Sequence, residues 1–292
     1  MSALEVNLTR RRIICPDGME VHALVGGSGS PVLLLHGCPQ TSVMWREVAS
    51  TLAHRFTVVA PDLRGYGESS HPVGHADHSN YSFRAMALDQ VHLMDALDFA
   101  EFRVAGHDRG GRVAHRLALD HPERVQRLAV LDILPTLTMY AHTDRTFATA
   151  YWEWFFFTQD AGFPEALIGA APEAFLDHEL GELRQRGVIT EDAWQAYVTA
   201  LADPSAVHGM CEDYRAAATI DLEHDRHDLS RRVECPLLVL WGTENVVWRP
   251  YDMLRVWQER AVDVTGRGLP CGHYLAEEEP GLTASLLAEF FA

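Results

Sequence analysis

The chain has little positive charge. Among its 292 residues, 24 are Lys or Arg and 41 are Asp or Glu, which gives a formal net charge of −17. Surfaces that bind nucleic acids or anionic membranes depend on clustered basic side chains. The composition therefore argues against both kinds of partner. It leaves room for a small anionic organic substrate, because a basic pocket can lie inside an acidic surface.

Long hydrophobic runs are also missing. No segment approaches the roughly 18 consecutive apolar residues of a membrane-spanning helix. Residues 1–18 contain three arginines but lack the apolar run that a signal peptide needs. We therefore expect a cytoplasmic protein that has no membrane partner.

Cysteine is scarce and unpatterned. The five cysteines are odd in number, far apart and without the spacing of metal ligands. They are Cys15, Cys38, Cys211, Cys235 and Cys271. We expect reduced structural thiols and no metal.

Short apolar runs alternate with amphipathic segments along most of the chain. The runs expected to form strands are 21–25, 32–36, 56–60, 102–105, 128–131, 236–241 and 262–264. Segments with helical periodicity are 43–53, 84–99, 109–120, 251–260 and 281–290. This alternation predicts an α/β fold with a mostly parallel sheet that helices cover on both faces.

The alternation stops between about residues 135 and 228. This segment contains the aromatic cluster YWEWFFF at 151–157 and helix-like stretches at 192–201 and 210–218, but no convincing parallel-sheet strand. We therefore predict a core domain made of residues 1–134 and 229–292. Residues 135–228 would form a helical cap, or lid, inserted into that core.

Asp108 lies where the strand expected at 102–105 turns into the helix expected at 109–120. A serine in a G-x-S-x-G turn at this place would indicate acyl transfer. A carboxylate instead attacks a saturated carbon that carries a leaving group, and water can then hydrolyse the resulting alkyl ester. Asp108 therefore predicts the opening of a carbon–halogen bond or of an epoxide, with no cofactor.

Hydrolysis of such an ester requires a base that takes a proton from water, and histidine is the natural choice. His273 is the best candidate among sixteen histidines, because it lies in a loop just past the last expected strand. An acidic partner would hold its tautomer and stabilise the imidazolium. Asp132 has the right position for that role, at the end of the strand expected at 128–131.

In the order nucleophile, acid, histidine, the chain resembles the α/β-hydrolase superfamily over almost its whole length. More narrowly, it resembles the fluoroacetate and haloacetate dehalogenases. The matching segments are HGCPQ at 36–40, DLRGYG at 62–67, GHDRGGR at 106–112, YWEW at 151–154, CEDY at 211–214 and PCGH at 270–273. The resemblance implies an α/β-hydrolase fold, a homodimer, and the hydrolysis of a short 2-haloacid to the 2-hydroxyacid and halide.

Arg109 and Arg112 fall in the first turn of a helix, where the helix dipole disfavours cations. Either an anionic ligand or the neighbouring Asp108 would explain them. The resemblance implies that both grip the substrate carboxylate, which suits the bidentate geometry of a guanidinium group. The backbone N–H groups of Arg109 and Cys38 are expected to form the oxyanion hole for ester hydrolysis.

Trp154 and Tyr214 match the family residues that donate hydrogen bonds to the departing halide. A histidine is the third donor in the family, and Glu153 stands at its position here. An ionised Glu153 would repel the halide and favour chloro- or bromoacetate over fluoroacetate, whereas a Glu153 protonated by its apolar surroundings could donate. We favour the ionised form. A third possibility is that Glu153 points away and pairs with a lid arginine such as Arg145.

Two other functions fit the same residues. An epoxide hydrolase acting on a small, carboxylate-bearing epoxide would use the same nucleophile, acid and histidine. Its ring oxygen would need an acid, for which Tyr214 is one candidate and Tyr151 a weaker one. A ligand receptor on a hydrolase scaffold could also retain these residues with negligible turnover.

Overall fold

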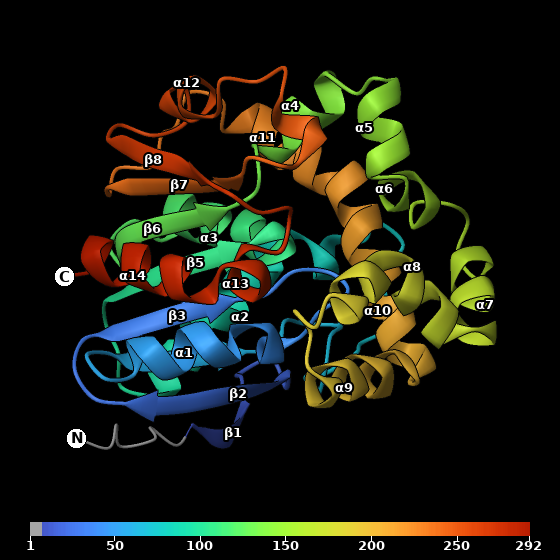
Figure 1. The fold of residues 1–292 in the computed structure, drawn as a ribbon, viewed down its shortest axis with the longest axis horizontal. Helices are drawn as coiled ribbons and strands as arrows, with labels where there is room; N and C mark the ends of the chain where they lie inside the picture. The colour runs from blue at the N-terminus through green and yellow to red at the C-terminus, as the bar shows by residue number, and fades with distance from the viewer. Residues whose placement is uncertain (1–7) are drawn as a thin grey trace.

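The computed structural model describes residues 8–292, and at its centre is one eight-stranded sheet (Figure 1). The strands are β1 (Thr9–Ile14), β2 (Glu20–Gly27), β3 (Pro31–Leu35), β4 (Thr57–Pro61), β5 (Phe102–His107), β6 (Val125–Leu131), β7 (Leu237–Gly242) and β8 (Val264–Leu269). Their order in the sheet is β1-β2-β4-β3-β5-β6-β7-β8. Strands β1 and β2 pair antiparallel, as do β2 and β4, and every pair from β4 to β8 is parallel.

Six of the expected strands are present, and two differences have physical reasons. The strand expected at 262–264 is β8, which begins at Val264. Its glycines interrupt the apolar pattern of a strand. One of them, Gly266, allows the backbone of β7 to approach closely, because a Cβ there would lie 2.1 Å from the Val239 carbonyl oxygen. The sequence analysis missed β1, because an exposed edge strand with three arginines carries no apolar run.

Helices cover both faces of the sheet. The ones described first come from parts of the chain before β6 or after β7. The helices are η1 (Ser42–Trp45), α1 (Arg46–Leu52), η2 (Ser79–Tyr81), α2 (Phe83–Ala96), α3 (Asp108–Asp120), η3 (Val246–Trp248), α12 (Met253–Gln258), α13 (Leu275–Glu278) and α14 (Pro280–Phe290). Neighbouring residues of β3 point to opposite faces. Leu33 and Leu35 join the apolar cluster with α2, α3 and α12, while Val32 and Leu34 join the cluster with α1 and α14.

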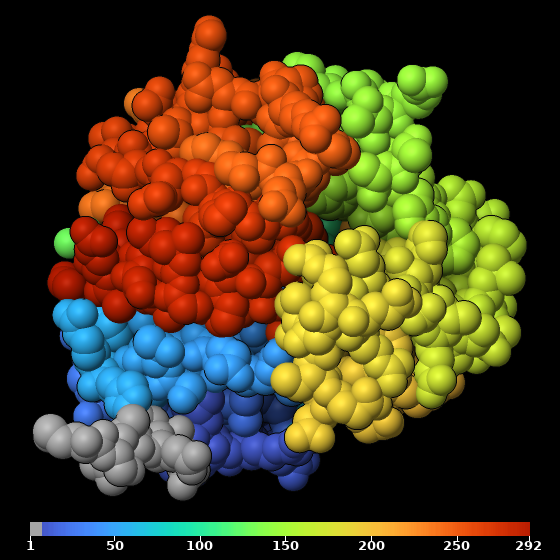
Figure 2. Space-filling model, in the orientation of Figure 1, coloured from blue at the N-terminus to red at the C-terminus, as the bar shows by residue number. Residues whose placement is uncertain are grey.

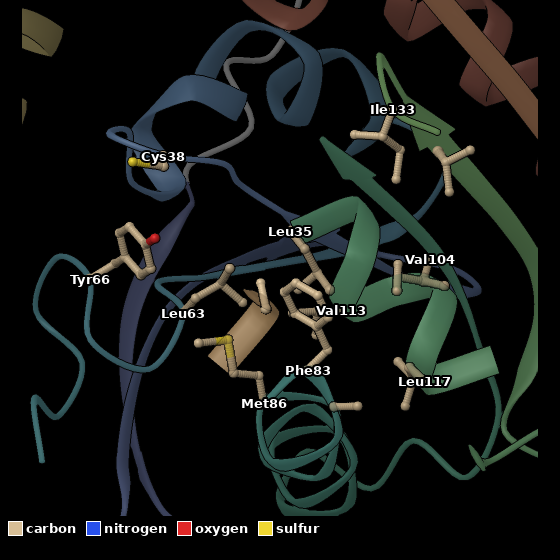
Figure 3. Close-up of a cluster of buried hydrophobic side chains, with 14 of the residues drawn as sticks. Leu35, Cys38, Leu63, Tyr66, Phe83, Met86, Val104, Val113, Leu117 and Ile133 are labelled. Atoms are coloured by element: carbon tan, nitrogen blue, oxygen red, sulfur yellow. The ribbon is translucent and has the colours of Figure 1, made fainter. Parts of the chain in front are cut away.

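The larger cluster supports the loops that carry the chemistry. Figure 3 shows Val113 and Leu117 of α3 beside Val104 of β5, with Phe83 of α2 close by and Leu35 above them. The residues labelled there are buried, so the start of α3 rests on a close-packed base.

All helices from α4 to α11 fall between β6 and β7 in the chain. They are α4 (Thr136–Ala141), α5 (Arg145–Ala150), α6 (Glu153–Phe156), α7 (Phe163–Ala170), α8 (Pro172–Gln185), α9 (Glu191–Leu201), α10 (Pro204–Ala218) and α11 (Ile220–His227). We call residues 136–227 the helical insertion. It packs against one side of the sheet domain, as the green-to-orange segment of Figures 1 and 2.

A signal peptide and a membrane-spanning helix were both considered from the sequence. Residues 1–7, part of the stretch considered for a signal peptide, lie outside them. Among residues 8–292, no helix combines the length and the apolar composition needed to cross a membrane.

Gly110 of α3 permits a close crossing of β3. A Cβ at this position would lie 2.4 Å from the carbonyl oxygens of His36 and Leu35. We therefore expect Gly110→Ala to lower the free energy of unfolding by about 1–3 kcal/mol through overpacking. Gly169→Ala in α7, where a Cβ meets nothing within 4 Å, is the control and should raise it by about 0.5–1 kcal/mol. Urea unfolding of both variants checks this, and equal effects would contradict it.

Candidate active site

Asp108 sits on a sharp turn between β5 and α3. Its φ of 45° lies in the left-handed region, which is strained for a residue with a side chain. Gly106 and Gly110 make the turn possible, because a Cβ on Gly106 would lie 2.3 Å from the Gly110 carbonyl oxygen. The turn places the Asp108 carboxylate in the wall of a cavity of about 380 Å³.

The surroundings of Asp108 keep it ionised. Burial pushes the pKa of this carboxyl up, but the positive charges of His273, Arg109 and Arg112 outweigh burial and hold the pKa below its usual value. The Cys38 N–H donates a hydrogen bond to Asp108 Oδ2 at 3.1 Å. The Arg109 N–H lies in the first turn of α3, where backbone N–H groups have no partner within the helix.

Asp132 and His273 are in direct contact. The His273 Nδ1–H donates to Asp132 Oδ2 at 2.6 Å, which leaves Nε2 as the basic nitrogen. Asp132 also accepts from the Gly242 N–H at 2.7 Å, the Trp248 indole at 2.7 Å and the Asn245 amide at 2.9 Å. With four donors, the carboxylate is fully satisfied and holds the imidazole in one orientation.

Burial alone would lower the pKa of His273. The hydrogen bond and the charge of Asp132, together with the charge of Asp108, outweigh burial and raise the pKa above its usual value. His273 therefore has the proton affinity of a general base for water, and both it and Asp108 line the same cavity.

Asn245 and Trp248 were not predicted as site residues, and Tyr151 was predicted only as a weaker acid candidate for an epoxide. Asn245 follows β7 at the same edge of the sheet as Asp132, so the rule that found Asp132 could have found it. Its amide donates to Asp132 and also to the Tyr151 hydroxyl oxygen at 2.8 Å. Tyr151, from the helical insertion, lies 3.1 Å from His273 Nδ1.

His36 is a structural residue. Its Nδ1–H donates to the Gly37 carbonyl oxygen at 2.9 Å, and its Nε2 accepts from the Leu63 N–H at 2.9 Å. Both ring nitrogens are therefore used in tying together the loops after β3 and β4.

Arg109 is held by Asp213 of α10. Its Nε and Nη2 donate to the two carboxylate oxygens at 2.8 Å and 2.5 Å, and both side chains are fully buried. The guanidinium carbon lies 4.1 Å from the ring centre of Tyr214 and 4.8 Å from that of Phe83. The remaining Nη1 is buried without a hydrogen-bond partner in the described part of the chain.

Arg112 has a different environment. Its Nη1 donates to the Leu134 carbonyl oxygen and to Thr136 Oγ1, both at 3.0 Å, and its guanidinium lies 4.5 Å from the ring centre of Trp154. Burial lowers the pKa of Arg112 to about 10, so it stays charged at neutral pH. Its Nε is buried and, among residues 8–292, has no partner.

Neither arginine side chain lines the cavity, and neither does Trp154. Tyr214, which packs on both Arg109 and Trp154, does line it. The Trp154 indole N–H is buried and lacks a partner within the described chain. Burial raises the pKa of Tyr214 well above its usual value, so its hydroxyl stays protonated. The structure thus gathers the arginines, Trp154 and Tyr214 into one layer next to the cavity.

Glu153 lines the cavity, and its environment differs from the one expected. Burial, and then the charge of Glu179, raises the pKa of Glu153 to about 9. This pKa favours the protonated carboxyl at neutral pH, whereas the sequence favoured the ionised form. Glu153 is in the cavity wall, whereas Arg145 is not among the residues that line it. Glu179 lies twenty-six positions further on, so its place in the same cavity wall could not be predicted from the sequence.

The remaining cavity wall comes from both parts of the molecule. The lining residues are Cys38, Pro39, Asp108, Thr149, Ala150, Tyr151, Trp152, Glu153, Phe157, Phe175, His178, Glu179, Tyr214, Asn245, His273 and Tyr274.

Outside this cavity, Cys15, Asp17 and His92 bring possible metal-ligand atoms within 4.8 Å of one another. Burial raises the pKa of the Cys15 thiol to about 12, and the absence of a metal from the reaction stays a prediction.

Known proteins that are similar in sequence to this chain are hydrolases. The family model described as "alpha/beta hydrolase fold" matches residues 30–280. A fluoroacetate dehalogenase from Burkholderia sp is 48% identical over 284 residues, which cover 97% of this chain and 93% of the relative. A soluble epoxide hydrolase from Corynebacterium sp. (strain C12) is 32% identical, covering 94% of this chain and 95% of the relative.

Solved structures agree with these sequence relatives. The crystal structure of an alpha/beta hydrolase from Nostoc sp PCC 7120 superposes with a TM-score of 0.95 at 50% identity, covering 97% of this chain and 98% of that one.

The Arg109–Asp213 pair generates a stability prediction. Asp213→Ala leaves a buried guanidinium without its counter-charge, so we expect the free energy of unfolding to fall by about 3–5 kcal/mol. Asp177→Ala, which removes an exposed carboxylate of the helical insertion, should change it by less than about 0.5 kcal/mol. Denaturant unfolding checks both variants. Similar stabilities for the two would mean that the pair does not hold α10 to α3.

Proposed function

This chain belongs to the α/β-hydrolase family, and from that premise we propose that it hydrolyses the carbon–halogen bond of short 2-haloacids to give the 2-hydroxyacid and halide. The 48% identity to a fluoroacetate dehalogenase supports this reaction class. The observation that carries the proposal is the combination of an ionised Asp108 with two adjacent buried guanidinium groups, each with an N–H that has no partner in the described structure.

Those two N–H groups belong to Arg109 and Arg112, and a small carboxylate would satisfy both. For such a ligand to reach the arginines, the side chains that separate them from the cavity, such as Tyr214, would have to move. The unpartnered indole N–H of Trp154 and the protonated hydroxyl of Tyr214 are suitable donors for a departing halide.

The first step is an in-line displacement. A carboxylate oxygen of Asp108 forms a bond to the carbon that carries the halogen, and the carbon–halogen bond breaks with its electron pair leaving on the halide. Asp108 needs no base for this attack because it is already ionised. The arginines hold the substrate so that the reacting atoms start close together.

The second step is hydrolysis of the Asp108 ester. His273 Nε2 takes a proton from water, and the resulting hydroxide adds to the ester carbonyl carbon. The Cys38 and Arg109 N–H groups stabilise the oxyanion. As this species collapses, the departing alkoxide takes the proton from the His273 imidazolium to give the 2-hydroxyacid, and Asp108 returns to the carboxylate by losing a proton to solvent. Asp132 stabilises the imidazolium that forms.

Chloro- and bromoacetate are proposed as better substrates than fluoroacetate, because fluoride is the poorest leaving group and needs the strongest hydrogen-bond donors. The 380 Å³ cavity exceeds the needs of a two-carbon acid, which supports activity on longer 2-haloacids. We also propose, from the family resemblance, that residues 135–228 act as a cap and that the enzyme is a cytoplasmic homodimer.

Hydrolysis of a small, carboxylate-bearing epoxide is the second candidate. The Tyr151 hydroxyl oxygen accepts from Asn245, and both Tyr151 and Tyr214 line the cavity with pKa values that burial raises well above the usual value. Two protonated tyrosines are what an opening epoxide oxygen requires. Halide release against diol formation, measured with small acids of matched size, separates the two reactions.

Replacement of the nucleophile tests the proposal. We expect Asp108→Asn, freshly purified and shown by mass spectrometry not to have deamidated, to lose halide release on the order of 10⁴-fold or more. In a single turnover in ¹⁸O water, the native Asp108 carboxylate should acquire label. An unlabelled carboxylate would instead indicate a receptor or a different nucleophile.

Replacement of the base should separate the two steps. In His273→Ala, the ester on Asp108 should form but hydrolyse slowly, because no group removes the proton from water. Halide release should then stop after about one equivalent per site, and the adduct should be visible in the mass of the Asp108 peptide. His178→Ala, at another histidine of the cavity wall, is the matched control and should continue to turn over. Continued turnover by both variants would remove His273 from the mechanism.

A further inference from the structure

Three carboxyl groups face one cavity. Asp108 begins α3, Glu153 begins α6, and Glu179 lies on α8. Neither glutamate forms an ion pair with a basic side chain between residues 8 and 292, and Glu179 Oε1 is buried without a hydrogen-bond partner. With both arginines behind the wall, ionising all three carboxyls that line this cavity is unfavourable, so at least one glutamate must keep its proton.

We propose that Glu153 is a catalytic hydrogen-bond donor to the departing group, and that Glu179 is a positioning residue whose negative charge keeps Glu153 protonated. This inference rests on the proposed function for the identity of the departing group. Glu179 belongs to none of the motifs that carry the family resemblance, and it lines the same cavity as Glu153.

The order in which the three groups ionise follows from their surroundings. Asp108 ionises first, because positive charges surround it. Glu179 follows: burial raises its pKa to about 7, against the opposing effects of His273 and of a hydrogen bond from Trp152. The charge on Glu179 then adds to the burial of Glu153, whose pKa reaches about 9. At neutral to mildly alkaline pH, Glu153 therefore keeps its proton while Asp108 is ready to attack.

The donor role balances without a further reagent. As the Asp108 oxygen bonds to carbon and the halide leaves with the electron pair of the broken bond, the Glu153 O–H donates a hydrogen bond to the halide and keeps its proton. An ionised Glu153 would have no proton to donate and would repel the halide. Halide release should consequently fall as the pH rises through the pKa of Glu153.

Other titratable groups surround Glu153 and must be distinguished from it. Those of the cavity wall, besides the carboxyls, are Cys38, Tyr151, His178, Tyr214, His273 and Tyr274. Burial raises the pKa values of the three tyrosines and of Cys38 well above their usual values. His273 must be neutral to act, so it limits the acid side of the profile. Arg112 loses its charge only near pH 10.

The first experiment measures the two carboxyls directly and needs no turnover. In protein labelled with ¹³C at glutamate carboxyls, the signal that disappears in Glu153→Gln identifies Glu153, and its titration gives the pKa. We expect this pKa to lie several units above that of an exposed glutamate and to fall by about one unit in Glu179→Gln. Glu173→Gln, which removes an exposed charge from the same helix, should leave it in place. A normal pKa for Glu153, or no response to Glu179→Gln, would overturn the inference.

The second experiment measures halide release from chloroacetate and from bromoacetate between pH 6 and 10. The quantity compared is the ratio of chloride release to bromide release. Both substrates compete in one reaction, so the ratio is that of their kcat/KM values, which excludes hydrolysis of the ester because that step follows halide departure and is the same for both. The ratio should fall at alkaline pH, because chloride depends more on the donor than bromide does. The fall should move to lower pH by about one unit in Glu179→Gln, stay in place in Glu173→Gln, and be absent in Glu153→Gln, whose amide donates at every pH.

The two failures can be told apart. If the ratio of the native enzyme is flat while both haloacetates are hydrolysed, the role of Glu153 is wrong and the proposed function stands. If no haloacetate releases halide, the proposed function is wrong, and the carboxyl titration still decides whether Glu179 controls the proton on Glu153.

Discussion

The buried ion pair between Arg109 and Asp213 joins the sheet domain to the helical insertion, and the geometry of the candidate site depends on it. Arg109 follows Asp108 directly, while Asp213 lies on α10 of the insertion. The Tyr66 hydroxyl also donates to Asp213, at 2.8 Å. Breaking such a pair by separating its partners leaves two uncompensated buried charges. Helix α10 is therefore firmly held against α3, and Tyr214, the next residue on α10, is placed between Arg109 and the cavity.

The charge balance at the site is local and does not follow the overall charge. The protein carries a net charge of −17 and contains no lysine, so all 24 of its basic side chains are arginine. A guanidinium group resists deprotonation on burial far better than an ammonium group does. This property matters for Arg109 and Arg112, which are 0% and 4% exposed and stand beside an ionised Asp108. A protonated Glu153 on the other wall of the cavity limits the repulsion that a third negative charge would cause.

Much of the architecture could be predicted from sequence because it rests on local patterns. The central strands are apolar runs, the Asp108 turn is marked by its glycines, and the family resemblance indicated the fold. The strand β8 was misplaced because its glycines serve close backbone packing, a requirement that only the neighbouring strand reveals. Edge strand β1 was missed because its residues face solvent.

The parts of the site that escaped prediction depend on contacts between distant segments. Asp213 neutralises Arg109 although sequence reasoning considered only the adjacent Asp108. Burial, and then the charge of Glu179, raises the pKa of Glu153, and Glu179 is remote in the chain and belongs to no motif that we recognised. Asn245 became significant only once its contacts with Asp132 and Tyr151 were visible. Pairwise electrostatics across a cavity leave no periodic trace in a sequence.

Tyr151 gives the insertion a direct effect on the imidazole. Its hydroxyl belongs to the insertion, accepts from Asn245 and lies beside His273 Nδ1. The proton affinity of His273 and the placement of the insertion are consequently linked quantities, and thermodynamics requires the linkage to act in both directions. A ligand that shifted the insertion would change the basicity of His273, and protonation of His273 would change, by the same free energy, which placement of the insertion is preferred.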